Sequence, residues 1–529
     1  MTTLLINGRI HSPAQPDATA MAVRDGVIAW LGSDDVGRTL HPDARVVDLE
    51  GGFVAPAFVD SHVHVTATGL NLNGLDLRAA TSLRHCLQLL ADHAQVHRDG
   101  PVWGHGWDES GWPERTPPST DDLDAVLGDR PAYLARIDVH SAVATTALRR
   151  VVPDLAAAAG FSPQDPLTAD AHHLIRAAAR AHLTTRQRHD ARVAALDHAA
   201  AHGIVAVHEC AGPEIGGLDD WLELRALDHG VDVIGLWGEA ARDADHAKSL
   251  IAETGAHGLA GDLFVDGALG SRTALLHAPY SDAGDTRGNR YLDQDTITAH
   301  LQACTQAGIP AGFHVIGDAA VSAVVDALAV VAGEHGAPAV ARCGHRLEHL
   351  EMVTAAQAAQ LGAWGVTASV QPMFDALWGG DAGMYAQRLG PQRARQLNPF
   401  ALLASEGVPI AFGSDTPVTS MNPWETVRAA VLHHTETAAI SPRAAFTAAT
   451  RGGWRACGVR DGVSGTLTPG APASYAIWDA DELEVSAPAN AVQRWSTDPR
   501  SRVPALPRLA DAELPRCRQT VHRGVVIYG

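Results

Sequence analysis

Short apolar runs alternate with Ala-rich helical stretches between residue 57 and about residue 455, and this alternation limits the fold more than any other feature of the chain. It predicts parallel βα units. Nine apolar runs occur, one more than a (β/α)8 barrel requires. They span residues 57–64, 132–140, 203–210, 231–238, 261–267, 309–318, 345–352, 365–372 and 408–415.

The stretch between the first and third runs is long and unlike a βα unit. It carries GHGWDESGWPERTPP, which is rich in Gly, Trp and Pro. We therefore assign residues at about 70–165 to an inserted cap, with the run at 132–140 as part of it. Eight runs remain, so the expected fold class is α/β, with a (β/α)8 TIM barrel over residues 56–455.

Both ends of the chain show a different pattern. Residues 1–55 hold short alternating runs with tight turns at NG and DG, which is typical of a small β-sheet. Residues 456–529 return to short strands, in GTLTPGAPASYAIWD and RQTVHRGVVIYG. We expect these two segments to meet in one small composite β-sandwich domain.

Composition excludes several classes of protein. The formal net charge of −20 argues against nucleic acid or an anionic membrane as a partner. No apolar run approaches the ~18 residues of a membrane span, and the N-terminus lacks the pattern of a secretory signal. The six cysteines have no CxxC spacing, so we expect free thiols in a cytoplasmic protein.

Two histidines lie two residues apart at the end of the first barrel run, in AFVDSHVHV. Residues i and i+2 of a strand point to the same face, so His62 and His64 would project together, as two ligands of one ion must. Alone, such a pair is more often a hydrogen-bonded couple. Three later runs also end in candidate ligands, namely His314, His349 and Asp415.

Barrel active sites lie at the carboxyl ends of the strands, so these five side chains would converge on one face. Nitrogen ligands with one carboxylate suit zinc or another first-row divalent ion. A carboxylate beside a metal-activated water can accept its proton and deliver it to a departing amine, and Asp415 is the strand-end candidate for that role. The alternative for Asp415 is an Asx-turn or a helix cap before Thr416-Pro417.

The chain resembles the amidohydrolase superfamily, in particular its YtcJ-like, amidohydrolase-3 group, which includes N-substituted formamide deformylases. The ordered motifs that carry the resemblance are FVDSHVH, GHGWD, RIDVH, VDGALGSRTALL, GFHVIGDAA, RLEHLEM, FGSDTPV and GTLTPG. The resemblance implies a metal-dependent hydrolase with a histidine ligand set of His62, His64, His314 and His349. It implies that Asp415 both contacts the metal and shuttles protons.

The sequence departs from this family at the residue that bridges two metal ions. Many relatives use a carboxylated lysine on the fourth strand, and the family register puts Asp262 at that position. The chain has one lysine, Lys248, in a polar helical stretch upstream. A bridge could come from Asp262, although its side chain is shorter, or from Glu209 or Cys210 on the second strand, which face opposite ways. The remaining alternative is a site with one ion. We favour Glu209 or a single ion.

Candidate substrate-binding residues lie in the cap and after the strands. The loop GHGWDESGW supplies Trp107 and Asp108, either as a lid or as part of ordinary cap packing. His140 could hydrogen-bond the scissile carbonyl or be structural. Arg272 could bind a substrate anion or pair with the aspartate of VDG, and Gln371 would line the pocket after the seventh strand.

These features predict a metal-dependent hydrolase that cleaves a non-peptide C–N bond in an amide, a cyclic amide or a formamide. We expect one or two divalent ions per chain, with Zn2+ as the expected metal, and a small amide-type substrate, and we leave a homodimer open. Two alternatives remain. A deaminase of the same superfamily would release ammonia without forming a new carboxylate. A barrel without activity, serving as a binding module, would have lost ligands that this sequence retains.

Overall fold

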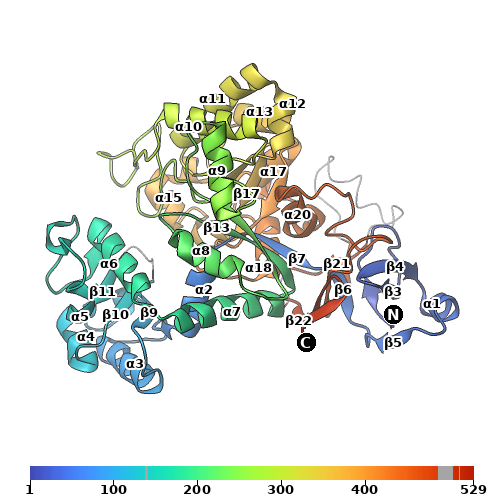
Figure 1. The fold of residues 1–529 in the computed structure, drawn as a ribbon, viewed down its shortest axis with the longest axis horizontal. Coiled ribbons are helices and arrows are strands. Elements are labelled where there is room, and N and C mark those ends of the chain that lie inside the picture. The colour runs from blue at the N-terminus through green and yellow to red at the C-terminus, as the bar shows by residue number, and fades with distance from the viewer. Residues whose placement is uncertain (138–140, 486–503, 511–512) are drawn as a thin grey trace. The chain divides into compact units, whose positions relative to one another are not determined.

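The computed structural model describes residues 1–137, 141–485, 504–510 and 513–529. The chain forms two compact units, which are described separately (Figure 1). One unit contains Met1–His64 together with Asp197–Gly529, and the other contains Val65–Leu196. No single helix in the described ranges is long and apolar enough to cross a membrane, and one bent pair, Asp318–His335 with Ala337–Cys343, reaches that threshold by length and composition only.

The larger unit contains the parallel strands of the barrel. One sheet has the order β14–β13–β7 and a second has the order β15–β16–β17–β18. The strands are β7 (Phe58–Val63), β13 (Ile204–Ala211), β14 (Asp232–Trp237), β15 (Gly312–Val315), β16 (Arg346–His349), β17 (Thr367–Val370) and β18 (Ile410–Phe412). A parallel bridge between Val63 and Thr416 joins the last strand to the first.

The segment at residues 258–264 takes the fourth position in the barrel. It joins β14 through a Leu236–Gly258 bridge and joins β15 through bridges at Leu259 and Phe264. The run at 261–267 is therefore irregular rather than a continuous strand, in contrast to the sequence prediction. Gly261 lies at φ +78°, outside the extended region, and interrupts the ladder. With this segment the barrel has the eight positions of a (β/α)8 fold.

Helices follow the strands, and their ends match the local sequence. Helix α10 (Gln294–Ala307) begins where the Asp293 side chain accepts a hydrogen bond of 2.8 Å from the Thr296 amide. Helix α13 (Ala355–Trp364) begins with a capping box formed by Thr354 and Gln357. Helix α10 packs against α9 (Ala244–Thr254) and α11 (Asp318–His335), so these helices form one outer layer.

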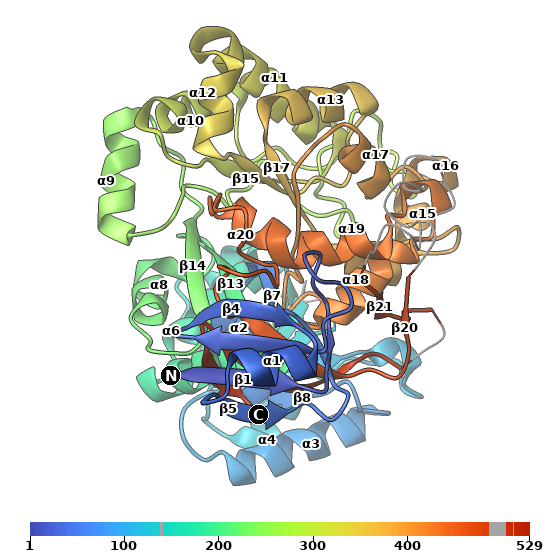
Figure 2. The same ribbon diagram turned by 90° about the vertical axis from the view of Figure 1, so that its right-hand side faces the viewer.

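Both ends of the chain contribute to a β-sandwich in the larger unit. The first sheet has the order β4–β3–β1–β5 and consists of N-terminal strands, seen in blue in Figure 2. The second has the order β2–β6–β19–β22–β23, in which β19 (Tyr475–Asp479) pairs antiparallel with β6 (Phe53–Pro56). Leu5 and Met21 of the first sheet share one apolar core with Val54 and Ile477 of the second. The remaining strands are β1 (Thr2–Ile6), β2 (Arg9–Ile10), β3 (Ala20–Arg24), β4 (Val27–Gly32), β5 (Arg45–Asp48), β22 (Arg516–His522) and β23 (Val525–Tyr528).

The unit Val65–Leu196 has its own sheet, with the order β12–β11–β10–β9–β8. Its strands are β8 (Leu75–Asp76), β9 (Val102–Trp107), β10 (Ala132–Arg136), β11 (Ser141–Ala144) and β12 (Leu167–Thr168). The apolar run that begins at residue 132, which was assigned to the cap, thus supplies β10, which pairs with β9 and β11. Trp107 is buried in the core of this unit, and its indole N–H donates to the Leu134 carbonyl at 2.9 Å.

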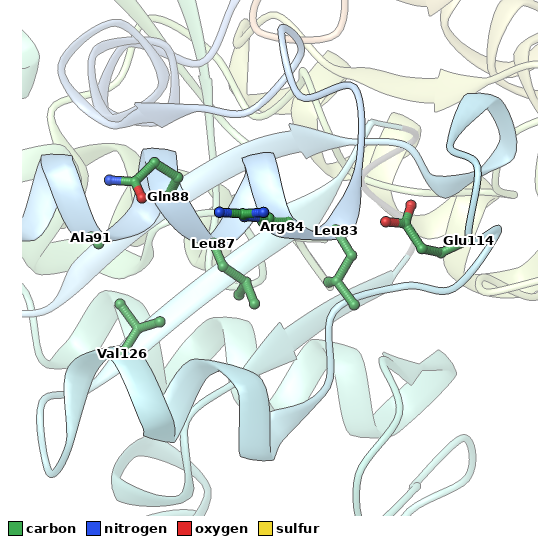
Figure 3. A pocket seen from close by; sticks show the side chains of 7 residues that line it. All are labelled: Leu83, Arg84, Leu87, Gln88, Ala91, Glu114 and Val126. Carbon is green, nitrogen blue, oxygen red and sulfur yellow. The ribbon is translucent and has the colours of Figure 1, made fainter.

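A hollow of about 460 Å³ opens on this unit between α3 (Leu83–Val96) and α4 (Thr120–Leu127) (Figure 3). Its lining is mainly aliphatic, with Arg84 and Glu114 as the charged side chains.

Candidate metal centre

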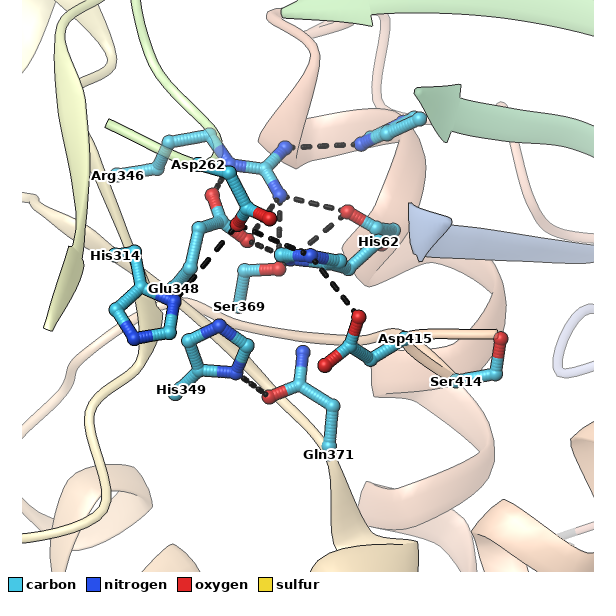
Figure 4. Close-up of polar contacts among 12 residues, drawn as sticks. His62, Asp262, His314, Arg346, Glu348, His349, Ser369, Gln371, Ser414 and Asp415 are labelled. Carbon is cyan, nitrogen blue, oxygen red and sulfur yellow. Dashed lines mark hydrogen bonds and ion pairs between the residues drawn. The ribbon is translucent and has the colours of Figure 1, made fainter. Parts of the chain in front are cut away.

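Six ionisable side chains meet at the carboxyl ends of the barrel strands, and Figure 4 shows five of them converging. His62 and His64 come from the end of β7, and Asp262 comes from the fourth barrel segment. His314 lies on β15, His349 ends β16, and Asp415 follows β18. All are buried except His64, which is partly exposed.

Four of these side chains lie at the separations expected of ligands around one metal ion. His62 Nε2 lies 3.4 Å from Asp262 Oδ1 and 3.4 Å from Asp415 Oδ1. His64 Nε2 lies 3.3 Å from Asp262 Oδ2 and 3.3 Å from Asp415 Oδ1. In a tetrahedral zinc site with ligand distances of about 2.0–2.1 Å, neighbouring ligand atoms are about 3.3–3.4 Å apart. The histidine–carboxylate distances match this spacing, and potential ligand atoms of His62, His64 and Asp262 lie within 4.8 Å of one another, so these side chains could hold a small divalent ion.

Asp262 also belongs to a second group of potential ligands. Its Oδ1 lies 3.8 Å from His314 Nδ1, and potential ligand atoms of Asp262, His314 and His349 lie within 4.8 Å of one another. His62 Nε2, His314 Nδ1 and His349 Nε2 are buried atoms with no hydrogen-bond partner. Buried polar atoms are rarely left in this state, and a metal ion would satisfy all three.

The local electrostatics suit metal ligation. Burial alone would raise the pKa of Asp262, but the surrounding imidazoles of His62, His314 and His64 hold that pKa well below its ordinary value. Burial, with His314 and His62 nearby, lowers the pKa of His349 to about 3, so this imidazole is neutral. His349 Nδ1 lies 2.8 Å from the Gln371 amide oxygen, which only accepts, so His349 Nε2 carries the free lone pair.

Strained backbone brings two of these residues into the cluster. His349 has φ +69° and Asp415 has φ +55°, both in the left-handed region that L-residues rarely occupy. In a regular strand, His349 would point to the opposite face from its neighbour Glu348. The left-handed backbone at His349 instead places its ring 5.0 Å from the ring of His62. The Asp415 amide donates to the His62 carbonyl at 2.8 Å, which holds the last barrel strand against the first. Such conformations cost about 1–3 kcal/mol each and concentrate at functional sites.

The alternative bridging residues lie differently from Asp262. Glu209 is buried on β13, but it belongs to none of the four groups of potential ligands found in the described residues. Cys210 forms one such group with His62 and Glu348. Asp262, on the irregular fourth segment, lies 3.4 Å from His62 Nε2 and 3.3 Å from His64 Nε2.

The other predicted site residues are dispersed. Gln371 contacts His349, as described above. Arg272 pairs with Asp282 through two hydrogen bonds of 3.1 and 2.7 Å, not with Asp266. In the smaller unit, Asp108 pairs with Arg136 at 2.9 Å. His140 lies outside the described residues.

Sequence reasoning missed two buried charged residues next to the cluster. The Glu348 carboxylate lies 2.9 Å from His62 Nδ1, and Arg346 contacts both of its oxygens. Burial would raise the pKa of Glu348, but Arg346 and His62 hold it below its ordinary value. The motif RLEH could have revealed both residues. Arg346 and Glu348 lie two positions apart in a buried strand, so their side chains share one face, and an ion pair between them would point into the barrel.

Residues 45–528 match the model of the amidohydrolase family, so the chain belongs to this family. The protein is therefore a hydrolase by class, and the resemblance predicted from the sequence is confirmed. Among curated proteins, the chain is 27% identical to protein LONG AFTER FAR-RED 3 of Arabidopsis thaliana, over 92% of this chain and 89% of that protein. It is 23% identical to the N-substituted formamide deformylase of Arthrobacter pascens, over 84% and 86% of the two chains.

The chain is also similar, over most of its length, to a solved structure of a metal-dependent hydrolase. The crystal structure of an uncharacterized metal-dependent hydrolase from Pyrococcus furiosus has a TM-score of 0.74 and 25% identity, and the match covers 91% of this chain and 99% of that chain.

Proposed function

We propose that this protein is a metal-dependent amidohydrolase that cleaves a non-peptide C–N bond, with Asp415 as general acid and base. The observation that carries the proposal is the distance of 3.3–3.4 Å between the Nε2 atoms of His62 and His64 and the carboxylate oxygens of Asp262 and Asp415. The metal-dependent hydrolase with the same fold supports it. The deformylase among the relatives favours an N-substituted formamide or another small amide as substrate.

The residues would hold two divalent ions, and Zn2+ fits the nitrogen-rich set best. His62, His64 and Asp262 would hold the first ion together with Asp415, which lies 3.4 Å from His62 Nε2 and 3.3 Å from His64 Nε2. Asp262, His314 and His349 would hold the second. Asp262 is thus the bridging carboxylate in this proposal, whereas the sequence favoured Glu209 or a site with a single ion. Bound there, a divalent ion supplies a water of lowered pKa and polarises the substrate carbonyl.

The protein side chains have separate tasks in this reaction. Asp415 accepts a proton from the attacking water on its carboxylate and then donates that proton to the departing nitrogen. Its backbone hydrogen bond to the His62 carbonyl, 2.8 Å long, keeps the carboxylate beside the histidine pair during both transfers. Gln371 holds the orientation of His349 through their 2.8 Å hydrogen bond.

The proposal is tested by metal analysis and by a panel of substrates. Protein purified without chelators and reconstituted with zinc should contain two ions per chain, and a His62→Ala, His64→Ala variant should lose at least one. The panel contains N-substituted formamides, cyclic amides and amidines, and each reaction is assayed for a new carboxylate or formate and for ammonia. Asp415→Asn should lower kcat by about 10²–10⁴-fold.

The remaining outcomes separate the alternatives. Ammonia released from the amidines, without a new carboxylate, would assign a deaminase. Fully metallated protein without activity on any compound would favour the binding module, and a protein that takes up no ion would refute the proposal.

A further inference from the structure

A buried charged network lies inside the barrel next to the metal centre. Arg346 is 1% exposed and Glu348 is fully buried, and both contact residues of other barrel strands. Barrel interiors are usually filled with branched apolar side chains. Replacing a buried ion pair by apolar residues of similar volume is often neutral or stabilising, so such a pair is weak evidence for a role in stability.

All three guanidinium nitrogens of Arg346 and both carboxylate oxygens of Glu348 make hydrogen bonds. Arg346 Nη2 donates to Glu348 Oε2 at 2.9 Å, and Arg346 Nε donates to Oε1. The same guanidinium donates to the Ser61 carbonyl at 2.7 Å and to Ser369 Oγ at 2.8 Å. Its Nη1 donates to His208 Nδ1 at 2.9 Å. The guanidinium therefore connects its own strand, β16, to β7, β13 and β17 and fixes the position of the Glu348 carboxylate.

The Glu348 carboxylate determines which nitrogen of His62 carries the proton. Glu348 Oε2 lies 2.9 Å from His62 Nδ1, and an ionised carboxylate only accepts hydrogen bonds. His62 Nδ1 must therefore donate, which leaves the lone pair on Nε2. That atom lies 3.4 Å from both Asp262 Oδ1 and Asp415 Oδ1. A hydrogen bond from the second nitrogen of a ligating histidine to a carboxylate orients the ring and strengthens the ligand.

We propose that Glu348, held by Arg346, is a positioning residue that sets the tautomer and direction of His62 for metal binding. The inference rests on the proposed function, since it requires that His62 bind an ion. Glu348 and Cys210 share a group of potential ligands with His62. We do not assign Glu348 as a ligand, because both of its oxygens already accept hydrogen bonds, Oε1 from Arg346 and Oε2 from Arg346 and His62.

The test measures zinc affinity and folding stability separately, on the full-length protein. Glu348→Gln keeps an acceptor oxygen but removes the charge, and the double variant Arg346→Met, Glu348→Leu replaces the ion pair with apolar side chains. Zinc affinity is measured by competition with a chelator, and the melting temperature is measured on metal-free protein. Loss of such a partner typically weakens metal affinity about 10- to 100-fold.

We expect zinc affinity to fall by about 10-fold in Glu348→Gln and by about 100-fold in the double variant. The metal-free double variant should melt at or above the wild-type temperature. The matched control is Asp232→Asn, because Asp232 also accepts from a histidine, His522, at 3.1 Å and from Arg523 at 2.6 Å, outside the metal centre. This variant should bind zinc with wild-type affinity.

Wild-type zinc affinity in both Glu348 variants would overturn the inference, as would a fall in affinity that only follows a fall in melting temperature. Should Glu348→Gln not fold, the double variant decides the matter alone. Should neither fold, the wild-type protein decides it through the downfield proton resonance of a carboxylate-bonded imidazole, which His62→Ala must abolish. Wild-type protein that binds no zinc would refute the proposed function. Zinc affinity that is the same in the wild type and in the Glu348 variants would refute only the positioning role.

Discussion

Substituting Asp262 by Asn tests the arrangement of the metal centre most directly. Asp262 belongs to both groups of potential ligands, one with His62 and His64 and the other with His314 and His349. Without its carboxylate, the first position keeps three ligands, since Asp415 remains, but the second keeps two imidazoles. We therefore expect the zinc content to fall from two ions per chain to one.

The change in stability follows from the number of ions bound. At a free zinc concentration of 100 times Kd, each ion stabilises the native state by about 2.7 kcal/mol. Unfolding entropy of about 2.1 cal/mol/K per residue gives about 1.1 kcal/mol/K for 529 residues. Zinc should therefore raise Tm by about 5 °C in the wild type and by about 2.5 °C in Asp262→Asn.

Scanning calorimetry with and without zinc measures these shifts, and elemental analysis counts the ions. The difference between the two scans removes any effect of the substitution on metal-free protein. Asp375→Asn is the matched control, because Asp375 is also a buried aspartate beside two histidines, His433 and His434, but it belongs to no group of potential ligands in the described chain. Two ions, or an undiminished zinc shift, in Asp262→Asn would refute the assignment of Asp262 as the bridge.

Three further predictions concern a close approach, a buried histidine and the smaller unit. Gly413→Ala should lower zinc content, because its Cβ would lie 2.5 Å from the His62 amide nitrogen, whereas Gly333→Ala, with nothing within 4 Å, should not. Burial lowers the pKa of His300 to about 4, so the unfolded state binds more protons below pH 6.5 and stability falls as the pH falls towards 4. Chemical denaturation of His300→Gln should therefore show about 2 kcal/mol less loss of stability between pH 7 and pH 5 than the wild type. Trp107→Phe should cost about 1–3 kcal/mol in thermal denaturation, because the buried Leu134 carbonyl loses its 2.9 Å donor.

Each of these has a result that would contradict it. Full zinc content in Gly413→Ala would mean that β18 can move away from His62 without cost. If the free energy of unfolding of His300→Gln changed with pH as it does in the wild type, His300 would not be held neutral between the Ala241 amide and the Leu259 carbonyl. A Trp107→Phe protein as stable as the wild type would mean that water replaces the indole N–H.

The sequence by itself determined the fold and most of the candidate ligands. Alternation of apolar runs with helical stretches predicts parallel strands, and strands in a closed barrel all present their carboxyl ends on one face. Residues at those ends are therefore brought together whatever the connections contain. This is why His62, His64, His314, His349 and Asp415 could be grouped without coordinates. The two-residue period of a strand predicts that His62 and His64 point to the same face.

Only the tertiary structure shows that Asp262 lies beside His62 and His64 and which way the His349 ring points. Both depend on irregular backbone, at the left-handed Gly261 beside Asp262 and at φ +69° in His349, which a period of two residues cannot anticipate. The partner of Glu348 is also a tertiary property, since His62 lies 286 positions away in sequence. Local patterns fix which face of a strand a side chain occupies, but the distance between two side chains on different strands is set by barrel closure and by the packing of all the residues around them.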